Sequence, residues 1–184
     1  MEANETSDTH LFEGCLQLLN QFHIGLRANE TRFDPYLMGE ARKRVQQLQR
    51  IIEMIKKLEE EHLEAALESH QNRDHKLLTR ISQDVETLTE SFYYFAFRLC
   101  KIVQGLPGLN GFKAVGIRDV RNKLIEHPEV PVLSFSFGGP EGPRVKGPRL
   151  VKDTGVWEDR GLYVNAAELV GELNRRLADL LKAD

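Results

Sequence analysis

The sequence predicts a mainly α-helical fold: an up-down bundle of four or five helices with a small β-hairpin or meander before the last helix. Apolar residues recur at steps of three and four through most of the first two-thirds of the chain, as in helices with one buried face. After Pro128 the pattern changes to alternation broken by prolines and glycines, and the helical spacing then returns. We expect a single domain over 1–184, composed of a bundle (9–127), a Pro/Gly-rich β excursion (128–164) and a C-terminal helix (165–183).

The first helix is expected from about Thr9 to Ala28, and the second from Pro35 to about Ser69. Asp34 and Pro35 predict the start of the second helix. The Asp34 side chain can accept hydrogen bonds from the free N–H groups of the first turn, and proline is tolerated at the first helical position. Each helix has one apolar face. The first face comprises Leu11, Cys15, Leu18, Leu19, Phe22 and Leu26, and the second comprises Met38, Ala41, Val45, Leu48, Ile52 and Ile55.

A third helix, from about Arg73 to Gln104, should lie antiparallel to the second, since the polar connection 68–72 between them is short. Gly105–Gly111 predicts a break, and a shorter fourth helix should follow over about 111–126. The third helix repeats the apolar spacing with Ile81, Val85, Leu88, Phe92, Phe95, Leu99 and Ile102. Its aromatic residues, expected to fill the bundle centre, are Phe92, Tyr93, Tyr94, Phe95 and Phe97.

After Pro128, alternation of apolar and polar residues predicts β structure. Leu133, Phe135 and Phe137 alternate with serines as in a half-buried strand, and the three prolines over 140–148 predict an irregular or edge-strand segment. A hairpin is expected where 156–158 and 162–164 flank Asp159-Arg160-Gly161. Asn165 with Glu168 resembles a capping pair that begins the last helix. The apolar face of that helix comprises Leu169, Leu173, Leu177, Leu180 and Leu181.

Composition favours a cytoplasmic protein. No segment approaches the roughly 20 apolar residues of a membrane span, and the N-terminus carries acids where a secretory signal carries positive charge. Cys15 and Cys100 have no redox or metal-ligand partner at short spacing. The net charge of −3 opposes non-specific nucleic-acid binding, so any RNA contact must be local. Two basic patches qualify: Lys113, Arg118, Arg121 and Lys123, and then Arg144, Lys146, Arg149 and Lys152, the second also compatible with solvated surface charge.

The segment Arg118–Pro128 is the most informative of the chain, because it gathers a guanidinium, a carboxamide and an imidazole near one helix end. Six residues of ideal helix separate Arg121 and His127 by about 9 Å of rise and about 120° of rotation. Pro128 disfavours helical geometry at His127, which frees that side chain to swing from the helix line. The helix end and the adjacent Glu126 should favour the charged imidazole, a form suited to proton transfer.

Arg121, Asn122 and His127 form the pattern R-N-x4-H, and here the chain resembles the HEPN superfamily of helical-bundle proteins over roughly residues 9–127. The resemblance implies a metal-independent endoribonuclease without cofactors, of the toxin or phage-defence type, whose site forms at a homodimer interface. His127 would be the general base or acid for attack of a ribose 2′-hydroxyl on phosphate. Arg121 would neutralise the phosphorane and Asn122 would orient the imidazole or donate to a phosphate oxygen, while Lys123 and Arg118 are candidate substrate contacts.

An alternative remains open at the same residues. Arg121 and Lys123 could be solvated helix charges and His127 a helix cap, and Glu129 stands where active members of the family have a tyrosine. The chain would then be a non-catalytic HEPN-like module for dimerisation or for binding a nucleotide or protein. An antitoxin or regulatory protein is a candidate partner under either interpretation. The other cluster with metal-ligand chemistry, His62 with Glu59, Glu60, Glu61 and Glu64, is expected to be a solvated helix face.

Overall fold

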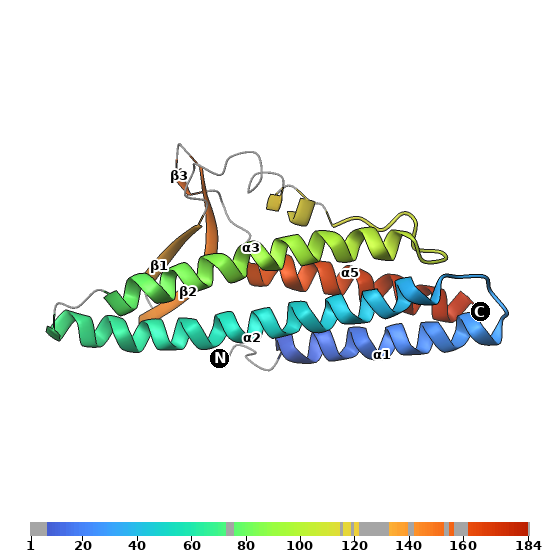
Figure 1. The fold of residues 1–184 in the computed structure, drawn as a ribbon, viewed down its shortest axis with the longest axis horizontal. Helices are drawn as coiled ribbons and strands as arrows, with labels where there is room; N and C mark the ends of the chain where they lie inside the picture. Colours follow the sequence, from blue (N-terminus) through green and yellow to red (C-terminus); the bar gives the residue numbers. More distant parts are fainter. Residues whose placement is uncertain are drawn as a thin grey trace.

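Four long helices lie side by side in the computed structural model and form a bundle, which confirms the mainly α-helical prediction (Figure 1). The structure describes residues 7–72, 76–114, 116–118, 120–121, 133–139, 142–152, 155–156 and 162–183. The long helices are α1 (Ser7–Ala28), α2 (Pro35–Asn72), α3 (Lys76–Gln104) and α5 (Leu162–Ala183). Helices α1 to α3 alternate in direction, whereas α5 runs in the same direction as α1 and α3 (Figure 1).

The turn between α1 and α2 explains where α1 ends and where α2 begins. The backbone N–H of Tyr36 donates to Asp34 Oδ1 at 2.9 Å, which is the cap predicted from Asp34 and Pro35. At the end of α1, Glu30 adopts a left-handed φ of 51° and the Thr31 N–H donates to the Leu26 carbonyl at 2.9 Å. Such a bond satisfies a carbonyl that the ending helix leaves unpaired.

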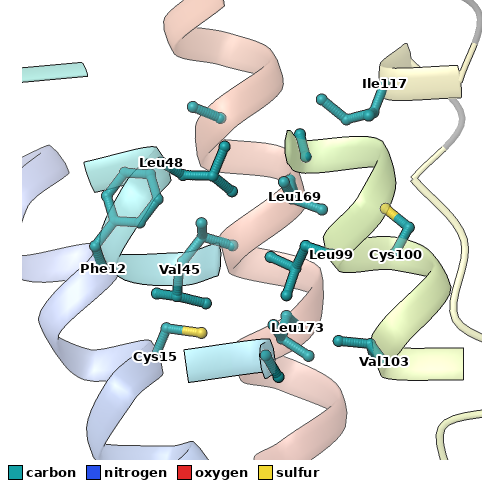
Figure 2. Close-up of a cluster of buried hydrophobic side chains, with 14 of the residues drawn as sticks. Phe12, Cys15, Val45, Leu48, Leu99, Cys100, Val103, Ile117, Leu169 and Leu173 are labelled. Atoms are coloured by element: carbon teal, nitrogen blue, oxygen red, sulfur yellow. The ribbon is translucent and has the colours of Figure 1, made fainter. Parts of the chain in front are cut away.

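The core lies where the predicted apolar faces meet. The full predicted set on α2 is buried, and Figure 2 shows side chains from α1, α2, α3 and α5 converging in one cluster. Predicted residues at the margin of the faces are only half-buried: Leu18, Leu88, Phe95, Ile102, Leu180 and Leu181. Of the aromatic cluster, Phe92 and Tyr93 are buried, Phe95 and Phe97 are half-buried and Tyr94 is 51% exposed. Phe12, which the sequence reading missed, is also buried.

The bounds of α2 and α5 differ from the prediction. The segment 68–72, expected to be a connection, is the last part of α2, which ends at Asn72. Helix α5 begins at Leu162, so 162–164 is helical rather than a strand, and Asn165 lies inside the helix rather than capping it. Packing explains the second difference: Leu162, Asn165 and Ala166 are all buried and extend the inner face of α5 by one turn.

Three antiparallel strands precede α5, in the order β1-β2-β3. They are β1 (Leu133–Gly139), β2 (Gly142–Lys152) and β3 (Gly155–Val156). The register between β1 and β2 shifts between the pairs Ser134↔Arg149 and Ser136↔Lys146, so Pro148 falls at an irregularity. Proline has no N–H to donate, and it is tolerated there because a residue at a bulge need not donate a hydrogen bond to the neighbouring strand. The described part of the segment expected to be irregular or an edge strand, 142–148, belongs to β2, which lies between β1 and β3 rather than at an edge.

The chain reverses after α3 through a compact loop. Leu106, Leu109 and Phe112 are buried, and Gln104 Nε2 donates to the Phe112 carbonyl at 2.7 Å. The predicted break at Gly105–Gly111 is therefore confirmed. The fourth helix, however, was expected from about Gly111, whereas Gly111 lies in a turn, 112–114 have no regular secondary structure and the described helical residues begin at Gly116. The buried side chains of Leu109 and Phe112 and the bond from the Phe112 N–H to the Leu109 carbonyl hold this part of the chain outside a helix.

Gly108→Ala is expected to lower the free energy of unfolding by about 1–2 kcal/mol. Gly108 has a φ of +71°, and a Cβ at this position would lie 2.7 Å from Leu180 Cδ2 of α5. The substitution therefore combines backbone strain with a displaced side chain. Chemical denaturation measures the change, and Gly111→Ala is the matched control because a Cβ there meets nothing within 4 Å. Equal stability of the two variants would contradict the strain argument.

No helix of the described chain has the length and apolar character needed to cross a membrane.

Candidate functional site

The structure places two of the five predicted site residues. Arg118 and Arg121 lie in the short helical stretch at 116–118 and 120–121, while Asn122, Lys123 and His127 lie outside the described residues. Ile117 and Val120 are buried and fix this stretch against the bundle. Arg118 is exposed and Arg121 is half-buried.

The stretch runs alongside α3 in the opposite direction. The Cys100 thiol is in hydrogen-bonding contact with the backbone of Ala114, and farther along the stretch Arg121 contacts Phe97, which is earlier in α3. Arg121 Cζ lies 4.7 Å from the centroid of the Phe97 ring. This is a cation–π distance, so the guanidinium of the predicted catalytic arginine is held against an aromatic face.

A second cation shares that ring. Lys101 Nζ lies 5.6 Å from the Phe97 centroid, one helical turn farther along α3. The i, i+4 spacing of Phe97 and Lys101 is visible in the sequence and predicts that they are neighbours on a helix. From the sequence, Phe97 was expected in the core and Lys101 was given no role. The sequence contains no signal that Arg121 packs on the Phe97 ring.

The helical stretch is also fitted closely to the start of α5. A Cβ on Gly116 would lie 2.7 Å from Asn165 Oδ1. Asn165 Nδ2 donates to the hydroxyl of Tyr93 on α3 at 2.8 Å, in a buried position. Glycine at position 116 thus allows the stretch that ends in Arg121 to approach α5, and Asn165 joins α5 to α3 at the same level.

A second polar cluster corrects the expectation of a solvated glutamate face. Glu60, Glu61 and Glu64 are exposed, but the hydroxyl of Tyr163 on α5 donates to Glu59 Oε2 at 2.6 Å. Burial raises the pKa of Glu59 to about 7, against the lowering effects of the Tyr163 hydrogen bond and of Lys56. Lys56 Nζ lies 5.5 Å from the centroid of the Tyr163 ring. A carboxyl that titrates near neutrality therefore lies between α2 and α5.

His23 is held in its neutral form by a third cluster. Arg42 Nη2 donates to His23 Nδ1 at 2.7 Å, which requires that nitrogen to be the unprotonated one. Burial and the charges of Arg42 and Arg27 lower the His23 pKa. The ring also meets Phe33 edge-on, with centroids 5.4 Å apart. These contacts join α1 to α2 and provide no acid for catalysis.

The cysteines are not placed for nucleophilic chemistry. Burial raises the pKa of both Cys15 and Cys100 to about 12, so neither is a thiolate nucleophile near neutral pH. Among the residues whose placement is described, no group of three or more His, Cys, Asp or Glu could hold a metal ion. The second basic patch, Arg144, Lys146, Arg149 and Lys152, falls entirely within β2.

Arg118 and Arg121 are thus the predicted site residues that the structure describes. Arg121 contacts Phe97, with Lys101 beside it, and neither Phe97 nor Lys101 was predicted to belong to the site. Comparison with protein-family models, with curated proteins and with solved structures finds no match to this chain.

Proposed function

We propose that this protein is a HEPN-like, metal-independent endoribonuclease of the toxin or phage-defence type, acting as a homodimer in the cytoplasm. The observation that supports the proposal best is the placement of Arg121, whose half-buried guanidinium is held 4.7 Å from the Phe97 ring centroid. A cation with a defined position contributes more to a transition state than one on a freely moving side chain, because less reorganisation is needed.

In the proposed reaction the ribose 2′-oxygen forms a bond to the adjacent phosphorus, and the bond from phosphorus to the 5′-oxygen breaks. His127 would take the proton from the 2′-hydroxyl or give one to the leaving 5′-oxygen, and water would carry the other of these two protons. Arg121 would balance the charge that develops on the phosphorane, and Asn122 would orient the imidazole or donate to a phosphate oxygen. Arg118 and Lys123 would contact the RNA backbone. The products are a cyclic phosphate and a 5′-hydroxyl end.

The homodimer is part of the proposal because the site would be built from two facing motifs. Pairing two copies doubles the local positive charge, which a chain of net charge −3 needs in order to attract RNA. An antitoxin or another regulatory protein would then control activity by covering this face.

The second candidate is a non-catalytic HEPN-like module for dimerisation or for binding a nucleotide or protein. It is favoured by the same contact, since an arginine that lies on a phenylalanine at a helix surface also has a purely structural use. The two candidates differ in what Arg121 and His127 do when replaced: a structural residue affects stability, and a catalytic one affects activity in a folded protein.

Expression in a bacterial host separates them. Wild type is expected to arrest growth with cleavage of total RNA, and Arg121→Ala and His127→Ala to abolish both, with at least about a hundredfold lower cleavage rate for the purified proteins. Arg44→Ala and His23→Ala are the matched controls: Arg44 also lies over a phenylalanine, with Cζ 5.2 Å from the Phe95 centroid, and both residues lie outside the motif. Both controls are expected to keep the arrest.

Growth is compared at equal levels of folded protein, measured by circular dichroism and size-exclusion chromatography. If the wild-type strain grows normally and the purified wild-type dimer leaves total RNA intact, the nuclease proposal fails and the binding module remains. If arrest persists in Arg121→Ala and His127→Ala, the activity has another site.

A further inference from the structure

We propose that Lys101 and Phe97 of α3 belong to the RNA site, Lys101 as a contact to the RNA phosphates and Phe97 as the residue that positions Arg121; this inference rests on the proposed nuclease function. Neither residue lies in the R-N-x4-H segment. Both come from α3, which the described stretch at 116–121 packs against, so the site would be shared between α3 and this stretch.

Geometry places the two charges together. Arg121 Cζ is 4.7 Å and Lys101 Nζ is 5.6 Å from the same ring centroid. Their separation cannot exceed the sum of these distances, which one phosphodiester or two neighbouring phosphates of a single strand can bridge. A phosphate group that reaches both cations is attracted by both.

The two residues differ in exposure, and this difference assigns their roles. Lys101 is exposed and Arg121 is half-buried against the ring. A flexible exposed ammonium is suited to attracting a phosphate, whereas a planar guanidinium fixed by stacking is suited to directed hydrogen bonds at the reacting phosphate. Phe97 touches no substrate in this arrangement and acts through Arg121.

The chain offers a close comparison for Phe97. Phe95 is also a half-buried phenylalanine of α3, and Arg44 lies over it with Cζ 5.2 Å from the ring centroid. Arg44 pairs with Glu40 through Nη2 at 2.9 Å within α2. The two aromatic–arginine contacts thus share their local chemistry, and only the Phe97 contact involves the motif.

The test measures cleavage of total bacterial RNA by purified full-length protein, with kcat and KM separated on a single-stranded RNA that the wild type cuts. Phe97→Leu is expected to lower kcat about fivefold or more with little change in KM, because the stacked arginine loses its fixed position. Phe97→Tyr, which keeps the ring, should retain the wild-type kcat. Phe95→Leu is the control for packing and is expected to keep kcat as well.

Lys101→Gln is expected to raise KM severalfold with kcat little changed, and Lys101→Arg to restore KM. Binding is measured by fluorescence anisotropy on a random-sequence single-stranded RNA with 2′-O-methyl riboses, which cannot undergo 2′-hydroxyl attack. The slope of log Kd against log salt concentration should fall by about 0.7 in Lys101→Gln, the value for one lost phosphate contact. Lys57→Gln, at an exposed lysine paired with Glu61 at 3.6 Å, is the matched control and should keep the wild-type slope.

Failure of this inference and failure of the nuclease proposal give different results. If wild type cleaves RNA but Lys101→Gln and Phe97→Leu behave like their controls, this inference is overturned and the nuclease proposal stands. If wild type binds the methylated RNA in a manner that depends on Lys101 but never cleaves, the nuclease proposal fails and the phosphate contact stands. A wild type that neither cleaves nor binds RNA overturns both.

Discussion

Leu173→Ala is expected to lower the free energy of unfolding by about 2–5 kcal/mol, the range for deleting a buried leucine side chain without full collapse of the cavity. Leu173 of α5 is fully buried and lies among residues of α1, α2 and α3 (Figure 2). The measurement is the denaturation midpoint in urea at constant slope, which reports a change in stability rather than in compactness.

The matched control is Val164→Ala, on the same helix but 48% exposed. Its effect should stay within about 0.5 kcal/mol, as for most surface substitutions. If Leu173→Ala were no more destabilising than this control, α5 would not contribute to the bundle core. The expected difference instead makes the C-terminal helix an integral part of the fold that carries Arg121.

Glu59→Gln is expected to stabilise the protein at pH 8 by about 2–3 kcal/mol and to leave its stability near pH 4.5 almost unchanged. Burial raises the pKa of Glu59 from 4.5 to about 7 in the folded state. Between these two pH values the folded protein holds more protons than the unfolded chain, so wild-type stability should fall as pH rises from about 4.5 to about 7. Above about pH 7 the buried carboxylate is charged in the folded protein, and the full free-energy cost of burying that charge lowers the stability.

Glutamine removes the charge and keeps an oxygen that can accept from the Tyr163 hydroxyl. Chemical denaturation of wild type and variant at several pH values measures the difference, and Glu60→Gln, at the exposed neighbouring position, should follow the wild-type profile. A wild-type stability that stays level from pH 5 to pH 8 relative to Glu59→Gln would show that Glu59 is charged at little cost in the folded protein.

The bundle could be predicted from the sequence because its determinants are local. A buried helix face repeats every three or four residues, so the inner faces of α1, α2 and α3 were readable without knowledge of their partners. The cap at Asp34 was equally local. The chain interval between Gly105 and Gly111 was also identified correctly as a break, since glycine and proline act on their own backbone.

The errors arose where distant residues decide the outcome. Asn165 has the sequence context of a cap, but it lies inside α5 with its side chain buried. There it donates a hydrogen bond to the hydroxyl of Tyr93 on α3, 72 residues away in the sequence. Glu59 looks solvated among its neighbours, yet Tyr163, 104 residues away, covers it. In the candidate site, Arg121 was predicted to lie on a helix that follows the break at Gly105–Gly111, and its described position is helical. Its contact with Phe97 could not be predicted, because it depends on how the stretch packs on α3. The roles of Asn122, Lys123 and His127 stay predictions.

The close approach of Gly116 to Asn165 has a consequence for how the chain can vary. A Cβ at 116 would lie 2.7 Å from Asn165 Oδ1, so the two positions share one volume. Among sequences that keep this packing, a residue larger than glycine at 116 requires a smaller one at 165. The smaller residue also gives up the hydrogen bond to Tyr93. Positions 116, 165 and 93 are thus expected to covary as a group, and this group connects the C-terminal helix to the stretch that carries Arg121.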